Sequence, residues 1–298
     1  MRMLWRLAVT ALVLTASTTL MAQWPKYVAT GAPTGADGKI DMNAPTPRTA
    51  DGHPDLSGVW EISRDPNAPP PPARGRAQGA AAEGRGAQGR GRAGQGGGSP
   101  FGNIGNSMPD QKAPYQPWAE ELVKKRMADN SKDNPDAHCL PMGIGQLNAH
   151  LYPRKIIQAP KELLLIYEAS GTTVREVFMD GRPLPKKDDV EPWYNGYSVG
   201  RWDGDTLVIE TVGLMDDGWL DVRGSPVTSN AKITERFRRP KFGQLELEET
   251  IDDSRAYTQP FTAKMFYRFS PDTQLIEFVC VDKDAQHYIG DASKQATR

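Results

Sequence analysis

Cysteine is scarce in this chain, which has only Cys139 and Cys280 among its 298 residues. The sequence also lacks any Cys-x-x-Cys or His-x-x-x-His pair, and these are the ligand spacings typical of zinc sites. His138 and Cys139 are adjacent, but two neighbouring ligands do not replace such a pattern. We therefore predict no metal site and no cofactor.

The two cysteines are predicted to form a single disulfide, because an oxidising compartment favours pairing of an isolated Cys139 and Cys280. Closing a loop of roughly 140 residues would stabilise the fold by about 4–5 kcal/mol through chain entropy. Two separate buried thiols are the alternative.

A net charge of either sign is missing as well, since 36 basic residues face 37 acidic ones. This balance gives no indication of a polyanionic partner, so we predict no binding of nucleic acid. Residues 66–106 form a Gly-, Arg- and Pro-rich stretch that imitates RNA-binding tracts, but it has too little apolar surface to fold. We interpret it as a disordered insertion. One hypothesis is that it contacts the cell envelope, which would make the chain a structural or interaction protein.

No apolar run is long enough to be a stable membrane span, which needs about 20 residues. The N-terminal run Leu7–Leu14 follows Arg2 and Arg6 and precedes small residues, which is the pattern of a secretory signal peptide cut after Ala22. We therefore expect a periplasmic or secreted protein with no integral membrane segment after processing. An N-terminal anchor that stays in place is the alternative.

Short β-rich runs separated by turn residues are what the chain has in abundance. With one strand at Leu56–Ile62, these runs give about ten strands. The others are predicted at 155–159, 162–168, 173–179, 196–202, 205–212, 231–238, 243–251, 261–269 and 274–281. One helix is predicted over 117–129, because Pro117 suits its first turn and acidic residues precede basic ones.

This pattern predicts an all-β fold. Many short strands joined by tight turns favour an antiparallel sandwich or barrel, and hairpins this short favour up-and-down neighbours. We predict one barrel domain over residues 55–282. An extended arm at 23–54 precedes it and a tail at 283–298 follows it.

The stretch Gly196–Gly200 reads GYSVG and fits G-x-S-x-G, the nucleophile turn of α/β-hydrolases. Asp203-Gly204 follows it between two β-rich runs, which predicts a two-residue hairpin turn. In the resulting register Ser198 lies opposite Ile209, and Tyr197 lies opposite Glu210. Ser198 is then inside a strand followed by another strand, whereas the nucleophile turn requires strand, turn and helix. We therefore interpret GYSVG as a strand.

Two resemblances follow from the motifs. Gly58-Val59-Trp60 resembles the G-x-W opening of lipocalins, in which the tryptophan closes one end of a barrel that holds a hydrophobic ligand. This implies a lipocalin-like barrel here. The pieces DLSGVW, DGRPLP, GYSVGRWDGDTLVIET, WLD, TERFRR and TIDDSRAYTQPF resemble a large family of exported bacterial proteins over residues 46–282. That family implies no assured activity, and its Pro-His-Ser before the TER strand reads Pro226–Ser229 (PVTS) here.

Carboxylates on apolar strand faces are the best indication of chemistry. By strand parity Glu210, Glu235, Glu249 and Glu277 each share a face with apolar side chains. Burial of a carboxylate is costly unless it is paired, and it raises the pKa, so carboxylates converging inside a barrel would form an acid/base site or a polar anchor. Structural ion pairs with Arg175, Arg201, Arg236 or Arg268 are one alternative. The other is that the opposite hairpin face, with Trp202, Leu207 and Ile209, points inward.

The first functional hypothesis is a binding module for a small hydrophobic or amphipathic molecule. Trp60, Tyr152, Arg201 and Trp219 are its candidate ligand-binding residues, and Tyr197, Arg201 and Glu210 would anchor the polar end of the ligand. Aromatic loop residues suit the mouth of an apolar pocket, although ordinary loop anchoring is the alternative for Tyr152 and Trp219.

The second hypothesis is a cofactor-free acid/base enzyme, namely a lyase, isomerase or hydrolase. It would use Glu210 or Glu235 together with Tyr197 or His150. His150 precedes a strand at the junction between a loop and the barrel, where a histidine can act as a general base. A capping or surface role for His150 is the alternative.

Overall fold

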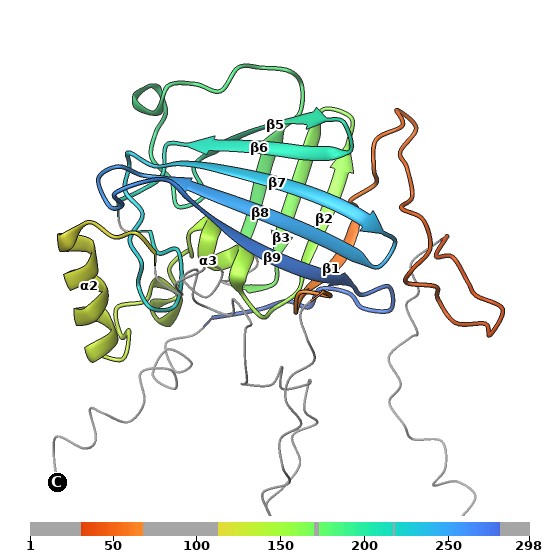
Figure 1. Cartoon of the computed structure of the whole chain (residues 1–298), viewed down its shortest axis with the longest axis horizontal. Helices are drawn as coiled ribbons and strands as arrows, with labels where there is room; N and C mark the ends of the chain where they lie inside the picture. Colours follow the sequence, from red (N-terminus) through yellow and green to blue (C-terminus); the bar gives the residue numbers. More distant parts are fainter. Residues whose placement is uncertain (1–30, 68–112, 170–172, 217, 281–298) are drawn as a thin grey trace, which may run out of the picture.

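Nine strands of the described chain close into a β-barrel in sequence order, and β9 pairs back onto β1 (Figure 1). The computed structural model describes residues 31–67, 113–169, 173–216 and 218–280. The strands are β1 (Gly58–Ser63), β2 (Arg154–Ala159), β3 (Glu162–Tyr167), β4 (Thr173–Phe178), β5 (Tyr197–Asp203), β6 (Thr206–Val212), β7 (Lys232–Lys241), β8 (Gln244–Asp252) and β9 (Phe261–Phe269). The predicted all-β, lipocalin-like barrel is confirmed. The predicted signal peptide, most of the predicted insertion and the predicted C-terminal tail lie outside the described residues.

The tenth strand predicted at 274–281 is wrong, because residues 274–280 form no strand. The pairing of β1 with β9, which includes Trp60↔Phe269, closes the barrel and leaves no free edge for another strand. The segment is held instead by the predicted disulfide, which is confirmed, with the Cα atoms of Cys139 and Cys280 5.6 Å apart. Glu277 consequently belongs to no barrel face.

The strands pair antiparallel all around the described barrel except between β4 and β5. These two share a single parallel pairing, Phe178↔Val199. Parallel neighbours cannot be joined by a tight turn, and residues 179–196, which include the short helix η3 (Lys187–Asp189), form the connection. We call this weakly paired junction the seam.

The hairpin of β5 and β6 turns one residue later than the Asp203-Gly204 prediction placed it. Asp203 pairs with Thr206, so the turn is Gly204–Asp205, and Gly204 has φ +59°. Glycine with positive φ at the first turn position is typical of a type II′ hairpin. The predicted register was therefore wrong: Ser198 pairs with Thr211 and not with Ile209.

The face of this hairpin that points inward is also the opposite of the predicted one, Val208, Glu210 and Val212. Leu207 and Ile209 of β6 belong to the main core cluster, and Glu210 lies on the outer face. On β7 and β8 the predicted inner faces are correct, because Glu235 and Glu249 are fully buried among core residues. The apolar character of both β6 faces is why alternation alone did not settle the question.

The α-helices lie at one end of the barrel (Figure 1). The predicted helix is confirmed as α2 (Pro117–Ala128), but the segment 130–153, interpreted as a loop, contains η2 (Pro135–His138) and α3 (Ile144–Ala149). Every residue of α3 is buried. A helix this short is unstable alone, so packing against the barrel stabilises it. None of the helices in the described ranges has the length and apolar character of a membrane span.

Trp60 lies near one end of the barrel, which we call the turn end because the β2–β3, β5–β6 and β7–β8 turns meet there. Its indole is fully buried and donates to the Leu56 carbonyl oxygen at 2.9 Å. The guanidinium carbon of Arg239 lies 4.8 Å from the Trp60 ring centre, and the Phe269 ring packs at 5.1 Å. The arm, shown in orange-red in Figure 1, also packs here, since the Phe242 amide donates to the Ala44 carbonyl at 2.9 Å.

Candidate functional site

A cluster of buried polar side chains lies inside the barrel, at the end opposite the turn end. We call it the interior cluster. No member is more than 2 % exposed. Its members, from α3 and eight strands, are Asn148, Arg154, Tyr167, Arg175, Ser198, Thr211, Glu235, Glu249 and Tyr267. Strand alternation points these side chains inward. We call this region the plug end, because α3 fills it.

Arg175 and Glu235 form the ion pair of the cluster. The guanidinium binds the carboxylate through two bonds, and the Nη1–Oε1 distance is 3.0 Å. It also donates to Ser198 Oγ at 3.1 Å and to Thr211 Oγ1 at 2.9 Å. Burial opposes the charge on Arg175, but the Glu235 carboxylate more than offsets burial and raises the arginine pKa above its ordinary value.

Glu249 is the unusual carboxyl group of the cluster. One oxygen accepts from Asn148 Nδ2 at 2.6 Å, and the other, Oε1, has no hydrogen-bond partner among the described residues. Burial, with a smaller contribution from the nearby Glu235 charge, raises the pKa of Glu249 to about 7. A carboxyl group of this kind exchanges its proton near neutral pH, which suits acid/base chemistry or recognition of a polar group.

Asn148 of α3 connects the two carboxylates. Its Nδ2 donates to Glu235 Oε1 at 2.8 Å as well as to Glu249, and its Oδ1 accepts from the Tyr167 hydroxyl at 2.9 Å. Both N–H donors of the carboxamide group and one of the two acceptor positions on its oxygen are thus used. The Asn148 side chain is thus held by the kind of hydrogen bonds that would hold a polar ligand.

The carboxyl end of α3 is held by Arg154 and Tyr267. Arg154 Nη1 and the Tyr267 hydroxyl both donate to the Asn148 carbonyl oxygen, at 2.6 and 2.9 Å. A positive charge near the carboxyl end of a helix is favourable. Gly145 lets α3 approach this closely, since a Cβ at that position would lie 3.1 Å from Glu249 Oε1. Arg154 Nε has no partner in the described part of the chain.

His150 contributes its backbone to this arrangement but not its imidazole. Its carbonyl oxygen accepts from Arg154, whereas the ring stacks on Tyr152 and its Nε2 lies 3.9 Å from an Asp136 carboxylate oxygen. Burial and, to a smaller extent, the Arg154 charge lower the pKa of His150 to about 4. The imidazole is therefore neutral at pH 7, and the structure does not place it with Glu235.

Glu210, Tyr197 and Arg201 do not enter the interior cluster, which corrects the site predicted from the hairpin register. Glu210 pairs with Arg201 at 2.7 Å and with Lys232 on the outer face. The Lys232 hydrogen bond, partly opposed by burial, lowers the pKa of Glu210 below its ordinary value. The Tyr197 hydroxyl accepts from Arg182. The alternative of a structural ion pair is therefore the correct interpretation of Glu210.

The aromatic candidates are all used in packing. Trp219 is buried in the β6–β7 connection beneath the Arg126 guanidinium, at 4.4 Å. Tyr152 stacks on His150 and contacts the Phe278 ring at 5.4 Å. These contacts agree with loop anchoring, and a role of these rings or of Trp60 in ligand binding stays a prediction.

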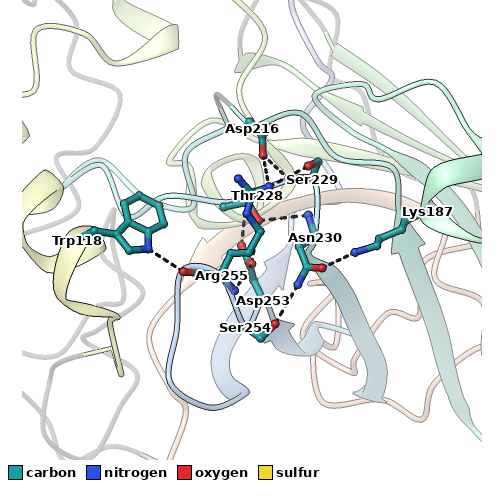
Figure 2. Close-up of polar contacts among 9 residues, drawn as sticks. All are labelled: Trp118, Lys187, Asp216, Thr228, Ser229, Asn230, Asp253, Ser254 and Arg255. Atoms are coloured by element: carbon teal, nitrogen blue, oxygen red, sulfur yellow. Dashed lines mark hydrogen bonds and ion pairs between the residues drawn. The ribbon is translucent and has the colours of Figure 1, made fainter.

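A second polar cluster fixes the loops near α2 (Figure 2). The buried Asp253 carboxylate accepts from the Thr228 amide and hydroxyl, both at 2.8 Å. Arg255 binds Asp216 at 3.3 Å, and its carbonyl oxygen accepts from the Trp118 indole at 2.7 Å. Since the charged groups drawn in Figure 2 have partners, this cluster anchors loops.

The sequence predicted Glu235 and Glu249, and it named Arg175 as an alternative ion-pair partner for such carboxylates, which the Arg175–Glu235 pair bears out. Ser198 was considered only as a nucleophile. The parity of β4, in which Arg175 shares a face with the fully buried Val177, was an available signal. Asn148 had no such signal, because its short helix shows no periodic pattern.

In the described ranges, no group of three or more His, Cys, Asp or Glu side chains is placed to hold a metal ion. A search of protein-family models gives no match to the chain, and a search of curated proteins gives none either. Function is therefore inferred from the geometry of the barrel.

Proposed function

We propose that this protein is exported and binds a small apolar or amphipathic ligand in its barrel, with the polar end of the ligand at the interior cluster. The observation that carries the proposal is the fully buried Glu249 carboxyl with an unpartnered oxygen. Leaving such an atom unpaired costs about 1–3 kcal/mol. Proteins keep few groups of this kind, so each one calls for a missing partner.

The surroundings of the cluster suit an amphipathic molecule. Small-molecule sites combine mostly apolar walls with a few polar groups that fix orientation. Around the cluster the barrel supplies apolar core residues, among them Ile156, Leu165, Leu207, Ile209, Leu247 and Met265. In the present structure α3 fills this end, so the ligand takes the volume that α3 leaves when it moves outward.

Export is part of the proposal and rests on two observations. The N-terminal sequence has the charge and apolar pattern of a signal peptide, and the disulfide Cys139–Cys280 suits an oxidising compartment. Resemblance to a family of exported bacterial proteins agrees with both and stays a prediction.

Titration with the apolar fluorescent probe N-phenyl-1-naphthylamine tests the binding function. We expect saturable binding of one probe per chain by the full-length mature protein. Binding by Glu249→Leu should be weaker, because this variant lacks the acceptor for the amine N–H of the probe. Glu210→Gln is the matched control, because it changes a carboxylate of the outer face and should bind as the wild type does. Unsaturable binding, or equal loss in both variants, would contradict the proposal.

A second function is favoured by the Glu249 pKa of about 7. A buried carboxyl that is half protonated at neutral pH can act as a general acid or base, with Arg175 and Tyr167 as neighbouring electrostatic groups. A screen of ester, lactone and enolisable carbonyl substrates tests this. Turnover should be abolished in Glu249→Gln and show a pH midpoint near 7, and turnover that survives the substitution would exclude Glu249 as the catalytic group.

A further inference from the structure

We infer that the ligand presents a primary carboxamide to the interior cluster, and that the side chain of Asn148 is an intramolecular stand-in for it. This inference rests on the proposed binding function and names the chemical class that the same site would take.

The hydrogen-bond roles around Asn148 select this group. Two carboxylates accept from its NH₂, at 2.8 Å for Glu235 and 2.6 Å for Glu249, and Tyr167 donates to its oxygen at 2.9 Å. A primary carboxamide offers two donors and an acceptor in one plane. An ammonium group has no acceptor for Tyr167, a carboxylate would meet two other carboxylates, and an alcohol offers a single donor.

Asn148 satisfies the site incompletely. With α3 in place, Glu249 Oε1 and Arg154 Nε still have no partner in the described part of the chain, although both are buried. Glu249 Oε1 is an acceptor, or a donor when Glu249 is protonated. Arg154 Nε is a donor on the guanidinium that binds the Asn148 carbonyl oxygen. A ligand with a further polar atom beside its carboxamide would pair groups that α3 leaves unpaired.

A ligand reaches this seat only if the helix that carries Asn148 moves out, although Ile144 and Leu147 of this helix pack in the core. It has six residues, which is too short for independent stability. Beyond the interior cluster, Gln146 binds only Asn134 Oδ1, at 3.0 Å, and its own oxygen is unpartnered among the described residues. Because α3 is part of the same chain, it competes with a ligand for the seat at high effective concentration. The apparent affinity of any ligand is therefore proportional to the fraction of molecules in which α3 has moved out of the barrel.

Displacement of N-phenyl-1-naphthylamine by octanamide, octanoate and octylamine tests the inference on the full mature chain. Asn148→Ala removes the stand-in and leaves a carboxamide-sized space. The loss of the Asn148 bonds also raises the open fraction, which favours every ligand. We therefore expect this variant to bind octanamide at least tenfold more tightly than the wild type, with gains for octanoate and octylamine at least threefold smaller than the gain for octanamide. Gln146→Ala is the matched control on the same helix. It loosens α3 without vacating the seat, so any gain should be equal for the three compounds.

The outcomes separate the two proposals. Equal gains for all three compounds in Asn148→Ala would overturn the carboxamide inference and leave the binding function standing. No displacement by any compound in either protein, together with no saturable probe binding, would overturn both. Should Asn148→Ala fail to fold, Tyr167→Phe provides the test. It removes the donor to the carboxamide oxygen of Asn148 and of the ligand alike, so octanamide affinity should fall relative to that of octylamine, which offers Tyr167 no acceptor. An unchanged ratio of the two affinities would overturn the inference.

Discussion

Both ends of the barrel bury an arginine against aromatic rings and backbone carbonyl oxygens, Arg239 at the turn end and Arg154 at the plug end. Only the plug end adds an arginine–carboxylate pair. At the turn end, Arg239 lies against Trp60 and donates to the carbonyl oxygens of Asp55 and Phe242. At the plug end, Arg175 pairs with Glu235 while unpaired polar atoms remain nearby. Carbonyl oxygens do not titrate, so the hydrogen bonds of Arg239 that close the turn end do not depend on pH. The plug end keeps groups that change with protons or ligands.

Removing Arg175 should have the largest effect. Arg175→Met leaves the Glu235 carboxylate buried without its counter-charge, and breaking a buried pair in this way costs about 3–5 kcal/mol. Urea unfolding measures the loss. The double variant Arg175→Met/Glu235→Leu removes both charges and should be more stable than Arg175→Met alone. A single-variant loss below about 1 kcal/mol would contradict the role of this pair.

At the turn end, Arg239→Met should cost about 1–3 kcal/mol, because it leaves carbonyl acceptors without donors. Burial lowers the Arg239 pKa to about 10, so the group keeps its charge below pH 8. The loss should therefore be the same at pH 5 and pH 8 in urea unfolding. A loss that varies across this range would show that the turn end, too, is linked to a titrating group.

At the plug end, two groups titrate with opposite effects on stability. The folded pKa of Glu249 is about 7 against an ordinary 4.5, so the folded state binds more protons and the free energy of unfolding falls as pH rises across that interval. The folded pKa of His150 is about 4 against 6.5, so the free energy of unfolding rises with pH across its interval. Neither slope can exceed about 1.4 kcal/mol per pH unit.

Single variants should separate these slopes. Relative to the wild type, Glu249→Gln should gain stability as pH rises from about 4.5 to about 7, and His150→Asn should lose stability as pH rises from about 4 to about 6.5. Urea midpoints at half-unit steps of pH provide the measurement. Parallel pH profiles of either variant and the wild type would show that the residue does not titrate as described.

The smallest effect is expected outside the barrel. Glu210→Ala removes an exposed ion-pair partner of Arg201 and should cost less than about 1 kcal/mol, with the loss shrinking as salt is added. Thermal unfolding at low and high salt checks this. A salt-independent loss as large as that of Arg175→Met would mean that Glu210 is not the outer-face ion pair described above.

The strands and most of their faces could be predicted from the sequence, because residue alternation and turn residues are local signals. The inner positions of Glu235 and Glu249 followed from that alternation. The β5–β6 register did not, because Asp-Gly and Gly-Asp turns differ by one residue and the conformation of Gly204 decides between them. Closure by β1 and β9, which excludes a tenth strand, is a property of the whole sheet that no local window contains.

The candidate site was less predictable, because its contacts join residues far apart in the chain. Asn148 meets Glu235 and Glu249 across 87 and 101 positions of sequence. No propensity identifies a six-residue helix between glycines and prolines, and packing decides that it forms. The two carboxylates could thus be predicted from the sequence, whereas the helix whose Asn148 binds them could not.

The seam gives the buried ion pair a mechanical meaning. Where β4 and β5 share one backbone pairing, Arg175 of β4 reaches Ser198 of β5, Thr211 of β6 and Glu235 of β7. The Arg175 side chain therefore links the strands by hydrogen bonds where backbone pairing is sparse. Arg175 thus both neutralises the interior carboxylate and joins the strands on the two sides of the seam.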